Sequence, residues 1–211
     1  MEIIKDCQQY DERYWDLRLG SVGGSNISPI LAKGKGRQTL KYRLAKEIIT
    51  GKREQTFVSK DMQDGHLWEP KNRAIYEWRY NVDVEQVAMI RSSLPGVHVS
   101  PDGLVGENGG LECKHKKGTV FLEFLAGGCK IDKSHIDQCQ HFLGVSGREW
   151  IDYSVYASEF DETNEGVVLT RDIDPLWVKR IYRDEEKIKE IQVEVVKFVA
   201  ELDELLKKLC I

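Results

Sequence analysis

Two acids and a lysine stand close together near the middle of the chain, at spacings that a β-hairpin would bring to one place. Asp102 lies in a Pro-Asp-Gly turn, and Glu112 and Lys114 are two residues apart on the next strand-like run. Side chains two apart on a strand share a face, so Glu112 and Lys114 should lie together, with Cys113 turned away. Two carboxylates and an ammonium can hold Mg²⁺ and position a water against a phosphodiester. The alternative is an ordinary surface hairpin, because both patterns also occur on solvated strands.

Composition favours one domain spanning residues 1–211. The chain has 211 residues, of which 41% are hydrophobic, enough for one substantial core. There is no run of apolar residues long enough for a membrane span, and the N-terminus lacks the pattern of a secretory signal. The five cysteines are scattered and form no CxxC pair, which argues against a zinc site or a disulfide framework. We therefore expect a cytoplasmic protein with no membrane partner.

The charge is unevenly distributed. The net charge of −4 argues against a general nucleic-acid coat protein. Basic residues nevertheless dominate positions 33–54, while acids outnumber bases at 183–208. A local basic stripe can bind phosphates on an otherwise acidic surface. The simpler alternative is a solvated helix face.

The periodicity predicts an α/β fold with helices packed on a central sheet. Gly34–Gly36 should form a loop, and Pro70 should either start a helix or kink it. A heptad-like pattern at the C-terminus predicts a long helix that lies on its own core or forms a subunit interface. The expected helices span 11–20, 27–31, 38–50, 61–80, 134–145 and 174–209, and the expected strands span 85–91, 96–100, 109–115, 119–125, 150–157 and 166–171.

A series of motifs resembles one nuclease family. Ser-Pro-Asp-Gly and Leu-Glu-Cys-Lys, around the acids above, follow Gly-x-x-x-Glu at 65–69 and precede Gln-Cys-Gln at 138–140. Trp15 to Gly20 and Gly24-Ser25 resemble the opening motif of the same family. Order and gaps from Tyr14 to Val145 resemble the phage lambda-type exonucleases, or YqaJ-like viral recombinases, of the PD-(D/E)xK superfamily. The resemblance implies a restriction-endonuclease-like core, a central mixed sheet flanked by helices.

The resemblance also implies catalytic and metal-binding roles. Asp102 and Glu112 resemble the principal Mg²⁺ ligands, and the backbone carbonyl of Cys113 resembles a further one. Lys114 resembles the residue that positions and helps deprotonate the attacking water. Glu69 resembles a helix acid near a second metal. Two Mg²⁺ ions are implied, with Mn²⁺ as a substitute.

Contacts to DNA are implied at two further places. Arg18, Ser25 and Gln138 resemble a pocket that grips a 5′-phosphate, and an arginine fork suits this role because it binds phosphate with two parallel hydrogen bonds. Met62 lies where the family has an apolar wedge that splits the duplex end. Lys35 lies where a basic residue would contact a DNA groove.

The implied function is a Mg²⁺-dependent 5′-to-3′ exonuclease that degrades one strand of duplex DNA from a 5′-phosphorylated end. The remaining 3′ strand would feed phage-type recombination by strand annealing. The implied partners are double-stranded DNA, a single-strand annealing protein and two further copies of the chain in a homotrimeric ring, in a bacterial host or encoded by a phage or prophage. The alternatives are a restriction-type or repair endonuclease of the same superfamily, and an inactive module that binds DNA ends.

Overall fold

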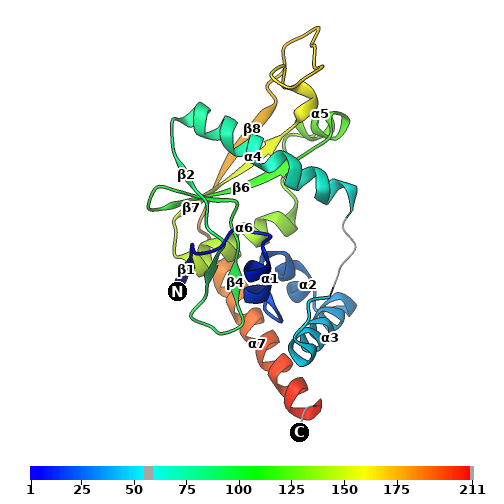
Figure 1. Cartoon of the computed structure of the whole chain (residues 1–211), viewed down its shortest axis with the longest axis vertical. Coiled ribbons are helices and arrows are strands. Elements are labelled where there is room, and N and C mark those ends of the chain that lie inside the picture. Colours follow the sequence, from blue (N-terminus) through cyan, green and yellow to red (C-terminus); the bar gives the residue numbers. More distant parts are fainter. Residues whose placement is uncertain (55–58, 210–211) are drawn as a thin grey trace.

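A mixed five-stranded sheet forms the centre of the protein (Figure 1). This computed structural model describes residues 1–54 and 59–209. The strand order is β2-β5-β6-β7-β8, and β6 and β7 are parallel whereas the other neighbours are antiparallel. A smaller sheet has the order β1-β3-β4. The strands are β1 (Glu2–Ile4), β2 (Val84–Glu85), β3 (Met89–Arg91), β4 (His98–Val99), β5 (Gly103–Val105), β6 (Gly109–His115), β7 (Trp150–Tyr156) and β8 (Leu176–Tyr182).

Helices cover both faces of the central sheet, as the sequence predicts (Figure 1). α4 packs on one face, over a core cluster that includes Tyr76 and Cys113, and α6 packs on the other, over a cluster that includes Phe142 and Leu143. α7 lies against α2, α3 and α6. The helices are α1 (Glu12–Arg18), α2 (Ile27–Ala32), α3 (Lys35–Thr50), α4 (Lys60–Tyr80), α5 (Gly118–Ala126), α6 (Lys133–Ser146) and α7 (Glu185–Leu209), with 3-10 turns η1 (Gly24–Asn26) and η2 (Ser158–Phe160).

Several predicted elements are confirmed. β6 has the predicted bounds, and β7, α4 and α6 differ from their predictions by one residue at one or both ends. α1 is shorter than predicted because Asp11 caps it by accepting a hydrogen bond from the Tyr14 amide, while Gly20 takes a positive φ of 63° just after its end. α3 begins at Lys35, inside the predicted Gly34–Gly36 loop. Pro70 lies within α4.

Four predicted elements are wrong. The predicted strand 119–125 is helix α5, and 166–171 contains no strand. The predicted strand 85–91 is divided between β2 and β3, which belong to different sheets. The predicted helix 174–209 starts too early, because 176–182 pair with β7 as the edge strand β8. α7 begins only after Asp184, whose carboxylate caps it by accepting a hydrogen bond of 2.9 Å from the Lys187 amide.

The heptad-like stripe of α7 faces the protein's own core, the first of the two alternatives. Its apolar residues Ile191, Val195, Phe198 and Leu202 are buried in a cluster with residues of α2 and α3. Within the described part of the chain, no helix is both long and apolar enough to cross a bilayer.

Strand β6 and helix α6 approach so closely that only glycine fits between them. A Cβ on Gly110 would lie 2.5 Å from Cε1 of Phe142. We expect Gly110→Ala to lower the free energy of unfolding by about 1–3 kcal/mol, since a packed core accommodates an added methyl group poorly. Gly65→Ala is the matched control: a Cβ there meets no atom within 4 Å, in the interior of α4. We expect that variant to gain about 0.5–1 kcal/mol. Thermal unfolding checks both, and shifts of the same sign in the two variants would contradict the packing argument.

Candidate active site

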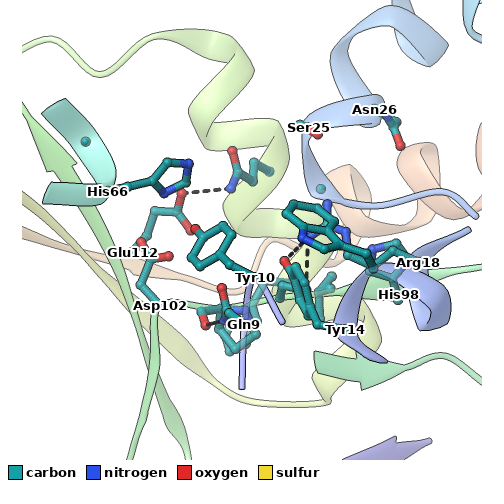
Figure 2. A pocket seen from close by; sticks show the side chains of 18 of the residues that line it. Gln9, Tyr10, Tyr14, Arg18, Ser25, Asn26, His66, His98, Asp102 and Glu112 are labelled. Carbon is teal, nitrogen blue, oxygen red and sulfur yellow. Dashed lines mark hydrogen bonds between the residues drawn. The ribbon is translucent and has the colours of Figure 1, made fainter. Parts of the chain in front are cut away.

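Most of the predicted site residues meet in one cavity of about 1070 Å³, lined by α1, η1, α3, α4, α6 and the β5–β6 region. Figure 2 shows the two ends of this cavity: Asp102 and Glu112 lie on one side, and Arg18 and His98 lie on the other. The predicted residues that line it are Arg18, Ser25, Glu69, Asp102, Glu112, Cys113, Lys114 and Gln138.

The acids and the lysine are joined by short hydrogen bonds. Oδ2 of Asp102 accepts a hydrogen bond of 2.6 Å from the Cys113 amide. Oε1 of Glu112 accepts one of 2.5 Å from Nζ of Lys114 and one of 2.7 Å from Nε2 of Gln138. The predicted shared face of Glu112 and Lys114 is thus confirmed. The Cys113 side chain is turned away into the core under α4, also as predicted.

Burial and the charges of neighbouring groups shift the pKa values of Asp102 and Lys114. Burial raises the pKa of Asp102 well above its usual value, and the charges of Glu112 and Glu69 add to this effect. Burial alone would lower the pKa of Lys114, but the carboxylates of Glu112 and Asp102 outweigh it and raise that pKa above its usual value. Lys114 therefore carries its positive charge at neutral pH and is held against Glu112.

Two residues that sequence reasoning missed fix the turn that carries Asp102. Arg73 donates to Oε1 of Glu69 at 3.0 Å and to the Asp102 carbonyl at 2.9 Å. Gln9 donates to the Pro101 carbonyl at 2.8 Å. The spacing of Glu69 and Arg73, four apart on a helix, was a signal for the first contact, whereas nothing in the sequence connects Gln9 to residue 101. Arg73 thus ties helix α4 to the hairpin.

The opposite end of the cavity presents a guanidinium without an acidic partner. Arg18 donates to the Tyr14 hydroxyl and, at 3.3 Å, to Oγ of Ser100. Its Cζ lies 5.0 Å from the Tyr14 ring centroid and 5.8 Å from that of Trp15. Ser100 was missed, although it belongs to the Ser-Pro-Asp-Gly motif. Among the described residues no carboxylate forms an ion pair with Arg18, so its charge is available to an anion.

A buried histidine lies beside Arg18. Ser21 donates its hydroxyl proton to the Arg18 carbonyl, so Nδ1–H of His98 donates to Oγ of Ser21, at 2.9 Å. Nε2 of His98 is buried and has no hydrogen-bond partner in the described structure. Burial lowers the pKa of His98 well below its usual value. The imidazole is therefore neutral and adds no positive charge to that of Arg18.

The donor atoms at the acidic end suit a hard cation. Mg²⁺ takes oxygen ligands, commonly one or two carboxylates with waters completing its shell. Asp102, Glu112 and Glu69 each keep one carboxylate oxygen without a hydrogen bond to the described residues. In residues 1–54 and 59–209, no three His, Cys, Asp or Glu side chains are gathered closely enough to form a complete metal cluster by themselves. The free carboxylate oxygens are of the donor type that Mg²⁺ prefers.

Lys35 and Met62 are the two remaining predicted DNA contacts. Lys35 is exposed at the start of α3 and does not line the cavity. The side chain of Met62 lies outside the described residues. Both remain predictions.

Solved structures of exonucleases share this fold. An alkaline exonuclease of Laribacter hongkongensis superposes with a TM-score of 0.83 at 30% identity, covering 94% of this chain and 96% of that chain. The same enzyme in complex with dAMP gives a TM-score of 0.81, with the same identity and coverage. A phage-related exonuclease of Haemophilus somnus 129PT gives 0.67 at 14% identity, covering 90% and 96%, which shows the fold alone. No curated protein sequence matches the chain significantly.

The class is therefore that of the α/β proteins with an exonuclease fold, here with a carboxylate–lysine cluster at the central sheet. Residues 13–149 match the YqaJ-like viral recombinase domain. The chain belongs to the YqaJ-like viral recombinase family.

Proposed function

We propose that the protein is a Mg²⁺-dependent exonuclease that degrades one strand of duplex DNA in the 5′-to-3′ direction, from a 5′-phosphorylated end. The observation that carries the proposal is the single cavity that joins Asp102, Glu112 and Lys114 to the unpaired guanidinium of Arg18. A solved relative, the Laribacter hongkongensis alkaline exonuclease, supports it, since that enzyme has been crystallised with a mononucleotide.

In this proposal the acids hold the metal and the cations hold the substrate. Asp102, Glu112 and the Cys113 carbonyl bind the first Mg²⁺, with Glu69 near a second. When bound, the metal supplies a lowered pKa for a water and charge stabilisation for the phosphodiester. The charged Lys114 donates a hydrogen bond that orients the attacking water.

The opposite end of the cavity sets which bond is cut. Arg18, Ser25 and Gln138 hold the terminal phosphate, with the Ser100 hydroxyl beside Arg18, so that the next phosphodiester lies at the acids. Gln138 also donates a hydrogen bond to Glu112 and so links the two ends of the cavity.

The wider role belongs to the same proposal. The strand left with a 3′ end would pass to an annealing protein for recombination, and the chain would act as a homotrimeric ring around the duplex. The Arg18 subsite favours an exonuclease over an endonuclease of the same superfamily, because an endonuclease has no need to hold a strand end. The acidic end contains Glu69, Asp102, Glu112 and Lys114. This set favours an enzyme over an inactive module that binds DNA ends.

Digestion of a 3′-labelled duplex tests the proposed activity. When only the 3′-labelled strand carries a 5′-phosphate, Mg²⁺ should give progressively shorter fragments that keep the 3′ label while the complementary strand stays full length, and EDTA should stop the reaction. Cleavage at internal sites of a closed circle would indicate an endonuclease instead. Binding to DNA ends without any Mg²⁺- or Mn²⁺-dependent cleavage would indicate the inactive module.

Arg18 should determine the preference for phosphorylated ends. We expect Arg18→Ala to lower the ratio of kcat/KM for 5′-phosphoryl over 5′-hydroxyl ends by about 10- to 100-fold, because a charge-assisted contact contributes roughly 1.5–3 kcal/mol. Digestion of matched duplexes measures the ratio. Arg171→Ala, at an exposed position outside the cavity, is the control. An unchanged ratio in Arg18→Ala would place the phosphate pocket elsewhere.

A further inference from the structure

Two more arginines, besides Arg18, line the same cavity without ionic partners. Arg43 comes from α3 and Arg53 from the segment after it. Most other arginines of the described chain are neutralised by acids, as Arg37 is by Glu201 and Arg180 by Asp152. No ion pair among the described residues involves Arg43 or Arg53. In a chain of net charge −4, three arginines without ion pairs in one cavity offer several cationic donors to an anion.

Arg18, Arg43 and Arg53 form an arginine cluster in the cavity, and two of them lie near one indole ring. Cζ of Arg53 lies 3.5 Å from the ring centroid of Trp15, and Cζ of Arg18 lies 5.8 Å from the same ring. Nε of Arg43 is buried and has no hydrogen-bond partner in the described structure. Burial lowers the pKa of Arg53, and the like charge of Arg18 lowers it further. The guanidinium groups are thus close enough to repel one another.

The acids nearest to the cluster, Glu47 and Glu54, bind backbone amides and a lysine rather than these arginines. Oε2 of Glu47 accepts a hydrogen bond of 3.1 Å from the Gly20 amide, and its Oε1 accepts one of 3.3 Å from the Glu54 amide. Glu54 itself forms an ion pair with Lys46 at 3.1 Å. Glu47 therefore braces the backbone around the cluster without forming an ion pair with Arg53.

The cluster lies at the Arg18 end of the cavity. Arg18 and Arg53 both lie near the Trp15 ring. Figure 2 shows Arg18 on the side of the cavity opposite Asp102. Arg18 therefore belongs both to the proposed phosphate pocket and to the arginine cluster.

We propose that Arg43 and Arg53 form a second anion subsite, which binds a phosphate group one linkage further in the 5′ direction than the phosphate held by Arg18. This inference rests on the proposed function, because it takes Arg18 to hold the phosphate on the 5′ side of the nucleotide that is removed. The same chemistry occurs in two sources: the outer phosphates of a 5′-polyphosphorylated end and the first diesters of a short 5′ overhang. In both, the subsite lets the enzyme accept ends that extend beyond a single phosphate.

A phosphate fits this subsite better than a nucleobase does. Stacking a base needs a free aromatic face, and Arg53 lies over the Trp15 ring at 3.5 Å while Tyr14 packs edge-on against it with centroids 4.8 Å apart. Guanidinium groups instead offer several N–H donors in the fork geometry that phosphate oxygens accept.

Binding of inorganic phosphate and inorganic pyrophosphate to the full chain tests the proposal without depending on catalysis. Isothermal titration calorimetry in EDTA avoids chelation of metal by pyrophosphate. We expect Arg43→Gln and Arg53→Gln each to weaken pyrophosphate binding about tenfold while leaving phosphate binding unchanged, since each removes a charge-assisted contact to the second phosphate alone. Arg171→Gln is the control, and Arg18→Gln should weaken both ligands. Arg53 is exposed, so its variant keeps the test valid if Arg43→Gln does not fold.

Equal losses for both ligands in the Arg43 and Arg53 variants would overturn the proposal, as would no loss at all. In either case phosphate binding that depends on Arg18 would leave the proposed function standing. Conversely, a selective loss of pyrophosphate binding in a chain that does not digest DNA would support the subsite and refute the exonuclease.

Competition with short duplexes then separates the two sources. A blunt 5′-triphosphate end and a two-nucleotide 5′ overhang are each compared with a blunt 5′-monophosphate end, in the wild type and in Arg53→Gln. The end that gains affinity through Arg53 identifies the natural ligand. If neither end gains affinity, the subsite has no role on DNA and the proposal fails.

Discussion

Glu112→Gln is expected to lower the single-turnover rate constant of duplex digestion by at least about 10³-fold. Glu112 is the centre of the acidic end, since one of its oxygens accepts hydrogen bonds from both Lys114 and Gln138. Glutamine keeps the size of the side chain but removes the negative charge that would bind Mg²⁺. Losing a metal ligand removes several kcal/mol of transition-state stabilisation, and each 1.36 kcal/mol is a factor of ten in rate. Asp102→Asn should behave in the same way.

The measurement is single-turnover digestion of a 5′-phosphorylated duplex, together with DNA binding in the absence of metal. Binding should remain measurable, because attraction to the DNA backbone is spread over many basic groups. Glu123→Gln, which neutralises an exposed carboxylate on α5, is the matched control. Turnover by Glu112→Gln within a few-fold of the wild type would exclude Glu112 as a metal ligand.

Lys114→Gln is expected to lower kcat by roughly 10²–10⁴-fold, the range typical of groups that orient or stabilise charge at a reacting centre. The carboxylates of Glu112 and Asp102 raise the pKa of Lys114, so its ammonium is charged throughout the neutral range. A neutral amide can still donate a hydrogen bond, but it cannot offset the negative charge that accumulates around the phosphodiester.

A split between kcat and KM distinguishes this role from a simple phosphate contact. Lys114→Gln should change kcat with little effect on KM, whereas Lys116→Gln, which lies beyond the acid–lysine pair on the same chain segment, should change kcat little. An effect of Lys114→Gln confined to KM would mean that Lys114 only binds the DNA backbone.

The acidic end of the site was accessible to sequence reasoning because its geometry is local. Glu112 and Lys114 share a face through the two-residue period of a strand, and Asp102 precedes them in a hairpin. The partners that hold these groups are distant in sequence: Gln9 reaches residue 101, and Arg73 reaches the Asp102 carbonyl. Their contacts arise only when the helices dock on the sheet.

The wrong element assignments have a similar origin. Residues 119–125 are rich in β-branched and aromatic side chains, a pattern that favours a strand, yet the chain turns there into α5, with Phe121 buried and its neighbours exposed. The Gly118 amide that opens this helix donates to Glu159, 41 residues later. Strand β8 is likewise defined by its pairing with β7. Local propensity carries no information about such partners.

The peptide group and the side chain of Cys113 belong to different parts of the molecule. Its peptide group belongs to the site, where the amide holds Asp102, whereas its thiol side belongs to the hydrophobic layer beneath α4. Any residue of similar size and apolarity supplies the same peptide group, so position 113 is free to drift in evolution under selection for stability alone. Its two neighbours are not, because the alternation of the strand points them into the cavity. Selection for a stable core therefore acts on the side chain at position 113, whereas selection for the reaction acts on the side chains of Glu112 and Lys114.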